Sequence, residues 1–236
     1  MKNDSEQLDL LLVGHAVEDW IFEDGKEPRQ QFGGIYNVNR SWNTIVKNRL
    51  GCRSKVRVEP SAYGHAFIKV DRENATKDVS ANLNDRLREP TLVPSKWTHY
   101  CYLNELENLR FDPDNRGILS ADVCAGKMLK GAYNFNYIFL SEDEHDPYKE
   151  SICCSYGEGG NRTIFISHSP NMVRLWNSGK ILWESKPIKQ LKGVSVLGCG
   201  DNFAASFIFA KLYLHSHDEE AANFAIARCG EYLLYN

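Results

Sequence analysis

Residues 198–203 bring together residue types that could do chemistry at one point of the chain. Gly198, Cys199 and Gly200 form a glycine turn, Asp201 follows at once, and an apolar segment runs from Phe203 to Leu214. If that segment is a helix, its first turn has N–H groups without helical acceptors and the positive end of the dipole, so it could hold an anion beside Asp201. Phosphoryl transfer requires such a combination. Asp is also a favoured N-terminal cap, so a purely structural role stays open.

The composition favours one globular domain and argues against nucleic acid as a partner. With 236 residues and 42% hydrophobic content, the chain can bury a sizeable core, and we expect a single domain over residues 1–236. Its 28 basic and 31 acidic residues give a net charge of -3, which provides no positive field for nucleic acid. The five tryptophans show no base-stacking pattern.

The cysteines and the N-terminal residues indicate the compartment. The seven cysteines lack CxxC spacing, and an odd number cannot all pair within one chain, so reduced thiols are favoured over a disulfide framework. The charged residues 1–7 precede only a short apolar run, and no stretch approaches the ~20 apolar residues of a membrane span. We therefore expect a cytoplasmic protein with no membrane partner.

The N-terminal fifth of the chain predicts a strand, a hairpin and a helix. Leu8–Val13 is short, almost wholly apolar and followed by Gly14, which is typical of a buried, central strand. A turn at Glu23–Gly25 between two aromatic segments predicts a hairpin. Apolar residues at helical spacing from Ile35 to Leu50, followed by Gly51, predict an amphipathic helix.

Further apolar runs and amphipathic segments alternate along the rest of the chain. We expect strands at Ala66–Val70, Trp97–Leu103, Ile118–Ala121, Tyr137–Leu140 and Thr163–Ser167, and helical segments at Val79–Leu87, Val123–Ala132, about 202–215 and 219–235. This alternation favours an α/β fold with a mainly parallel sheet. In such folds ligands bind beyond the carboxyl ends of the strands, where the loops converge.

Three features stand in a definite order along the sequence. Asp19 follows the first strand, Gly33 and Gly34 open a helix that contains Asn37, and the loop from Gly198 comes late. In this order they resemble the ribokinase-like carbohydrate kinases, also called the phosphofructokinase B family, over nearly the whole chain. The resemblance implies a three-layer α/β/α sandwich with a central, mainly parallel sheet. Because the chain is shorter than most of that family, we expect its β flap to be reduced to a hairpin at about 18–32.

The late loop resembles the family's Gly-Ala-Gly-Asp motif and stands here as Gly198-Cys199-Gly200-Asp201. The resemblance implies that Asp201 is the general base, which takes the proton of a substrate hydroxyl as that hydroxyl attacks the γ-phosphate of ATP. It also implies that the N–H groups of the turn from Gly198 through Cys199 to Gly200 form the anion hole.

The N-terminal features correspond to the family's substrate site. Gly33 and Gly34 would let the backbone approach a sugar closely, while Asp19 and Asn37 would hydrogen-bond its hydroxyls. The Gly-Gly-x-x-Asn spacing resembles that of heptose-phosphate kinases. The implied substrate is a sugar or sugar phosphate.

The donor side of the site matches the family less closely. Glu144 matches the Glu of an Asn-x-x-Glu motif that positions magnesium through water, but Ser141 replaces the Asn, and a solvated strand end is an equal alternative. The family's nucleotide-binding Thr-x-Gly appears only as Ser167-His168-Ser169, which implies that Ser167 and Ser169 contact the nucleotide. The implied cofactors are ATP and Mg²⁺.

These departures leave other functions open. The Asp-Thr pair that often precedes the glycine loop is absent, with Ser195-Val196-Leu197 in its place. A family member that has lost efficient catalysis and acts as a sugar-binding or regulatory protein is therefore an alternative, and so is a nucleoside kinase. Family members often pair through their flap strands, and apolar Trp20, Ile21 and Phe22 support a homodimer of this kind.

Overall fold

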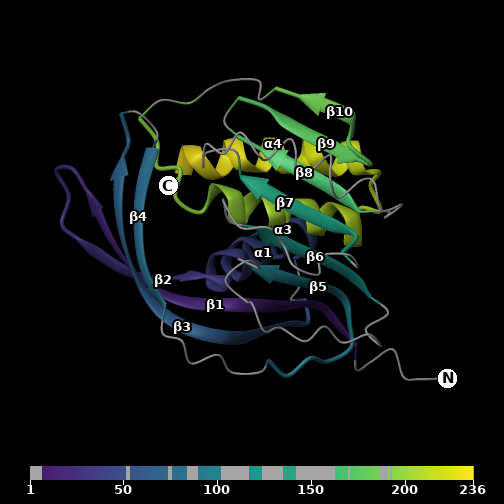
Figure 1. Cartoon of the computed structure of the whole chain (residues 1–236), viewed down its shortest axis with the longest axis horizontal. Coiled ribbons are helices and arrows are strands. Elements are labelled where there is room, and N and C mark those ends of the chain that lie inside the picture. Colours follow the sequence, from purple (N-terminus) through teal and green to yellow (C-terminus); the bar gives the residue numbers. More distant parts are fainter. Residues whose placement is uncertain are drawn as a thin grey trace.

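A computed structural model shows how these elements are arranged (Figure 1). It describes residues 7–51, 54–73, 76–83, 90–101, 117–123, 135–141, 163–169, 171–186, 191 and 193–235. The strands are β1 (Leu8–Glu23), β2 (Arg29–Gly34), β3 (Val56–Asp71), β4 (Thr76–Leu83), β5 (Ser95–Cys101), β6 (Ile118–Val123), β7 (Tyr137–Ser141), β8 (Ile164–His168), β9 (Val173–Asn177) and β10 (Lys180–Ser185). The helices are α1 (Ile35–Leu50), α3 (Cys199–Tyr213) and α4 (Asp218–Tyr235).

The strands form one sheet in the order β10-β9-β8-β7-β6-β5-β1-β3-β4, with β2 paired to β1. The six strands from β8 to β3 in this order are mutually parallel, whereas β2, β4, β9 and β10 pair antiparallel. As predicted, β1 is central, since it lies between β5 and β3. The expectation of an α/β fold with a mainly parallel sheet is confirmed.

The described helices pack on one face of the sheet, with α3 in contact with both α1 and α4 (Figure 1). From Asp201 to Ala210 every residue of α3 is buried, because the helix is enclosed by its two neighbours and by aromatic rings of the sheet. The opposite face also buries an apolar cluster, including Leu11, Tyr100 and Ile138. The predicted helix at Val123–Ala132 lies outside the described residues except for Val123, which ends β6.

Two strands run far beyond the helical layer and build a flap. The first strand does not stop at Gly14 as predicted. Instead β1 continues to Glu23, with a register shift between Gly14 and His15 where it pairs with β3. The second halves of β1 and β3, together with β2 and β4, curve up past the end of the helical layer near the C-terminus (Figure 1). We use the word flap for these four stretches.

The flap is larger than expected. The predicted hairpin at about 18–32 is present as β1 and β2, but the flap is not reduced to it, because the second half of β3 and all of β4 extend it. The prediction of a helical segment at Val79–Leu87 was wrong for its described part, since residues up to Leu83 belong to β4. Val79, Ala81 and Leu83 alternate with polar residues, and this period of two fits the pairing with β3.

Candidate active site

Asp201 is held in the first turn of the buried helix α3. Gly198 precedes the helix with φ 77° and ψ 6°, a left-handed conformation that glycine adopts without strain. Gly198 has no side chain to cap the helix, and the Cys199 N–H donates instead to the Val196 carbonyl at 3.1 Å. The positive end of the helix dipole lies at this turn, which favours an anion there. Asp201 lies in the same turn and is only 6% exposed.

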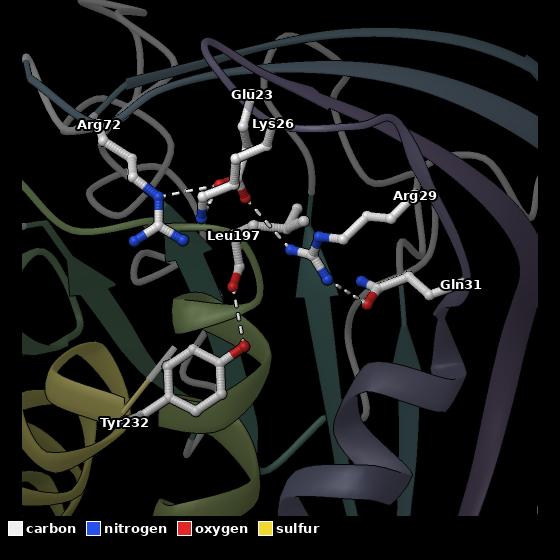
Figure 2. Close-up of polar contacts among 7 residues, drawn as sticks. All are labelled: Glu23, Lys26, Arg29, Gln31, Arg72, Leu197 and Tyr232. Atoms are coloured by element: carbon white, nitrogen blue, oxygen red, sulfur yellow. Dashed lines mark hydrogen bonds and ion pairs between the residues drawn. The ribbon is translucent and has the colours of Figure 1, made fainter.

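Tyr232 of α4 supports the turn at Gly198, and no local sequence pattern predicted this role. Its hydroxyl donates a 2.9 Å hydrogen bond to the carbonyl of Leu197, the residue before the turn (Figure 2). A Cβ on Gly198 would lie 2.8 Å from that hydroxyl, so the glycine also makes room for the tyrosine. Burial first, and then the nearby charges of Asp201 and Cys199, raise the pKa of Tyr232 to about 12.

Asp19 lies on the concave, inner face of the flap, and the Gly-Gly pair fits around it. A Cβ on Gly33 would come within 1.8 Å of Asp19 Oδ2, so only glycine leaves space for this carboxylate. Gly34 has φ 60°, and a Cβ there would meet the carbonyl oxygen of His15 at 2.2 Å. The two glycines thus let β2 turn directly into α1 beside Asp19.

The fold brings Asp19 and Asp201 into electrostatic contact although 181 positions separate them in the sequence. Asp19 is 3% exposed. Burial is the main cause that raises its pKa to about 6, and the charge of Asp201 raises it further, whereas Arg40 and Lys77 lower it. Two of the predicted site residues, one from each end of the chain, are therefore close enough for the charge of one to act on the other.

Asn37 lies in the first turn of α1 and is 8% exposed. Its amide oxygen accepts a hydrogen bond from Arg40, which also donates to the carbonyl of Phe32 at 3.0 Å. The amide nitrogen of Asn37 is therefore the group that would donate to a substrate hydroxyl. Arg40 was not predicted, although it lies one helical turn after Asn37 and so shares its face.

The end of β8 reaches the glycine turn through His168. A Cβ on Gly200 would lie 3.3 Å from His168 Cε1, and the His168 ring stacks on Phe203 with centroids 5.0 Å apart. Ser167 is buried, and its hydroxyl accepts a 3.1 Å hydrogen bond from the Trp176 indole. Ser169 bonds both the N–H and the carbonyl of Met172.

No group of three or more His, Cys, Asp or Glu side chains suited to a metal ion occurs within the described part of the chain. Glu144, the predicted magnesium residue, lies outside the described residues. Within the same described part, no helix is long and apolar enough to span a bilayer.

A charged cluster around Glu23, on the inner face of the flap, lies near Leu197, the residue that precedes the turn at Gly198 (Figure 2). Glu23 is almost fully buried and contacts Lys26 at 2.6 Å, Arg72 at 2.9 Å and Arg29 at 3.3 Å. Burial would raise the pKa of Glu23, but the hydrogen bonds and charges of Lys26 and Arg72 outweigh it and hold the pKa at about 2. Strand alternation was the signal that could have placed Glu23 on the face of Asp19.

Leu197 joins the flap to the glycine turn. Its side chain is buried in an apolar cluster with Val17, Ile21 and Ile68 of the flap, while its carbonyl accepts from Tyr232. The flap therefore rests on the residue that directly precedes Gly198.

Comparison with known proteins identifies the fold of the chain. No protein-family model matches the sequence, and no curated relative matches it. Solved structures do match. Adenosine kinase from Sinorhizobium meliloti matches with a TM-score of 0.64 and 12% sequence identity, over 96% of this chain and 94% of that chain. Arabidopsis thaliana ribokinase complexed with ribose and ATP matches with a TM-score of 0.61 and 15% identity, over 97% of this chain and 93% of that chain. A pyrophosphate-dependent kinase in the ribokinase family, complexed with a pyrophosphate analogue and myo-inositol, also matches (0.58, 14%, 95% and 94%).

The chain therefore has the ribokinase-like fold over its full length. This fold is shared with kinases that act on sugars and on nucleosides. The predicted resemblance is confirmed at the level of the fold.

Proposed function

We propose that this protein is a kinase that transfers a phosphoryl group to a hydroxyl of a sugar or sugar phosphate. The observation that carries the proposal is the meeting of Asp19 and Asp201 beside the N-terminus of α3. One carboxylate can hold the acceptor and the other can take its proton, while the helix terminus binds the transferred group.

In this mechanism Asp201 accepts the proton of the acceptor hydroxyl. The oxygen then attacks the terminal phosphorus of the donor, the bond from that phosphorus to the bridging oxygen breaks, and the shortened donor leaves. The turn from Gly198 through Cys199 to Gly200 is the proposed anion hole for the transferred phosphoryl group. The Cys199 N–H would have to leave the Val196 carbonyl, to which it donates at 3.1 Å, before it could bind this group. The flap, resting on Leu197, keeps water from competing with the acceptor.

Asp19, Gly33, Gly34 and Asn37 form the acceptor side. Asp19 accepts from one hydroxyl, and the Asn37 amide donates to another. The Tyr232 hydroxyl holds the turn before Gly198 in place through its hydrogen bond to the Leu197 carbonyl. It is a positioning residue in this proposal.

The donor is proposed to be ATP with Mg²⁺, and Glu144 to hold the metal through water. Ser167 and Ser169 stay the proposed contacts at the nucleotide end. Because both hydroxyls already have hydrogen-bond partners, we expect this segment to contribute through its backbone and through His168, which lies against Gly200. Pyrophosphate is the donor to test beside ATP, since one matching kinase is pyrophosphate-dependent.

A homodimer through the flap is also proposed. The outer face of the flap exposes Trp20, Phe22, Phe32, Tyr63 and Phe67. Trp20, Ile21 and Phe22 were predicted to support pairing. The prediction was wrong for Ile21, because this side chain is fully buried on the inner face of the flap.

The test is substrate-dependent donor cleavage across sugars, sugar phosphates and nucleosides, with ATP and pyrophosphate as separate donors. We expect Asp201→Asn to lower kcat by ~10²–10⁴-fold, because it removes the general base without changing the shape of the side chain. Asp78→Asn, an exposed position on β4, is the matched control and should retain full activity.

Two outcomes would contradict the proposal. If Asp201→Asn kept wild-type kcat, Asp201 would not be the base. If no acceptor were phosphorylated and neither donor raised the melting temperature, the sugar-binding or regulatory alternative would replace the kinase.

A further inference from the structure

Two cysteines from different helices meet at the glycine turn. Cys199 is the first residue of α3 and directly follows Gly198, whereas Cys229 lies in α4. The two helices pack against each other (Figure 1). Because 30 positions separate the two cysteines in the sequence, only this packing of α3 on α4 brings them together.

The Cys229 thiol contacts the first turn of α3 through three groups. Its Sγ lies 3.4 Å from the carbonyl oxygen of Cys199 and 3.8 Å from Oδ1 of Asn202. A hydrogen bond with the Cys199 side chain is the main cause that raises the pKa of Cys229 well above its ordinary value, and burial raises it further. The two sulfur atoms are therefore neighbours in the reduced protein.

The two thiols differ in their access to solvent. Cys199 is partly exposed, whereas Cys229 is 9% exposed and stays protonated because of its raised pKa. An oxidant from solvent therefore reaches Cys199 first, and Cys229 is in place to react with the oxidised residue. An accessible thiol beside a second, resolving thiol is the arrangement that redox-sensitive cysteines often have.

The main-chain contacts of Cys199 affect whether the turn can bind an anion. Its N–H donates to the Val196 carbonyl at 3.1 Å and must leave this acceptor before it can bind a phosphoryl group. Tyr232 of α4 already holds the Leu197 carbonyl, on the other side of Gly198 (Figure 2). A covalent bond from α4 to Cys199 would hold the turn on both sides of Gly198 and keep the Cys199 N–H on Val196.

We propose that Cys199 and Cys229 form a reversible disulfide that locks the glycine turn and prevents it from binding a phosphoryl group. The disulfide itself is independent of the kinase function, whereas its effect on catalysis rests on the function proposed above.

The oxidant in this proposal is a peroxide. Hydrogen peroxide converts the Cys199 thiol to a sulfenic acid and releases one water. The Cys229 sulfur then attacks the Cys199 sulfur, the S–O bond breaks, and the hydroxyl leaves with the Cys229 proton as a second water. The two thiols together lose two electrons and two protons to the peroxide. A dithiol reductant returns them and restores both thiols.

The first experiment maps the disulfide in the full chain. The reduced protein is treated with one equivalent of hydrogen peroxide, the remaining thiols are alkylated, and the digested peptides are identified by mass spectrometry. Among the seven cysteines, we expect the main product to be a peptide pair joined through Cys199 and Cys229, which dithiothreitol separates again. The oxidised protein should also melt roughly 5 °C higher, because the crosslink restricts the unfolded chain.

Amide hydrogen exchange tests the effect on the turn without any substrate. With the disulfide formed, the amide hydrogens of residues 198–201 should exchange at least tenfold more slowly than in the reduced protein, because the Cys199 N–H is kept on the Val196 carbonyl. Turnover in the donor-cleavage assay should fall tenfold or more on oxidation and return after dithiothreitol.

Two variants assign the protection to this pair of cysteines. Cys229→Ala cannot form the bond, so peroxide should produce no joined peptide and leave the exchange of the turn at the rate of the reduced variant. Cys101→Ala removes another buried thiol, at the end of β5, and is the matched control. It should keep both the joined peptide and the slower exchange. Urea unfolding of each reduced variant checks that the fold is intact.

The proposal is overturned if peroxide produces no peptide joined through Cys199 and Cys229, or if the joined protein exchanges at the reduced rate. It is also overturned if Cys229→Ala shows the same protection after oxidation. Failure of the kinase function is distinguishable from these outcomes. A disulfide that protects the turn in a protein without phosphoryl transfer contradicts the kinase alone, whereas turnover that is unchanged by the mapped disulfide contradicts only this inference.

Discussion

Asp19 shows how burial and one neighbouring charge change the chemistry of a single carboxyl group. Its ordinary pKa of 3.8 rises to about 6 in the folded protein, first because it is buried and second because Asp201 is near. Between these two values the native state binds a proton that the unfolded chain has already released. The free energy of unfolding that Asp19 contributes therefore falls as the pH rises from about 4 to 6.

Asp19→Asn removes this titration, so its effect on stability should depend on pH. We expect the free energy of unfolding of the variant, relative to wild type, to rise by roughly 2–3 kcal/mol between pH 4 and pH 7. Urea unfolding at pH 4, 5, 6 and 7 measures this difference, and exposed Asp78→Asn should give a flat profile. A constant difference for Asp19→Asn would show that the carboxyl titrates normally.

At the scale of elements, the junction between β2 and α1 sets the acceptor side of the site. Gly33 is the second-last residue of β2 and lies against Asp19, and Gly34 ends the strand and precedes α1 against the His15 carbonyl. Neither position has room for a side chain. The close packing of the strand, the helix and the Asp19 carboxylate therefore requires glycine at both positions.

Gly33→Ala should move the Asp19 carboxylate, because the new Cβ would lie 1.8 Å from Oδ2. We expect kcat/KM for the acceptor to fall by about 10²-fold through misplacement of the substrate, while donor binding changes little. Overpacking should also lower the free energy of unfolding by about 1–3 kcal/mol. Steady-state kinetics with each substrate varied in turn separates the two sides of the site.

The control is Gly230→Ala in α4, where an added Cβ meets nothing within 4 Å. This variant should be as active as wild type and slightly more stable, since alanine is the better helix former. Equal losses in both variants would mean that Gly33 has no special relation to Asp19.

At the scale of the whole molecule, the flap has two faces with different roles. The inner face carries Asp19, Glu23 and the residues that pack on Leu197. The outer face exposes a group of aromatic rings, among them Phe32 at 63% and Phe67 at 53%. Clustered exposed aromatic side chains favour an interface with another protein, and here we propose a second copy of this chain.

Sedimentation velocity over a range of concentrations tests this dimer. Phe67→Glu should weaken association at least tenfold, because it places a charge among the outer rings. Leu182→Glu, at an equally exposed apolar position on β10, should leave association unchanged. A wild-type protein that stays monomeric at every concentration would contradict the proposal.

Local sequence patterns determined much of the fold. Helical spacing from Ile35 to Leu50 and the stop at Gly51 predicted α1 with its exact ends, and Gly51 has the left-handed conformation expected there. The apolar run after the glycine turn predicted α3, but the helix begins at Cys199 and not at about 202, so Cys199, Gly200 and Asp201 belong to its first turn. These signals are local because a helix is defined by residues three and four positions apart.

The tertiary structure decided what the site contains. Val79 lies in a strand because it pairs with Ile68 of β3. The Glu23 carboxylate can be buried because Lys26, Arg29 and Arg72 form ion pairs with it. Neither β9 nor β10 was predicted, since the short apolar runs of both strands are stabilised mainly by pairing in the sheet.

The sequence by itself named Asp19, the two glycines and Asp201 as separate features, because each carries its own local motif. Only the long-range packing placed Asp19 against Asp201, Tyr232 against Leu197 and Arg29 on the inner face of the flap. Those contacts depend on which strands pair and in which register, and strand pairing is set by surfaces far apart in the sequence.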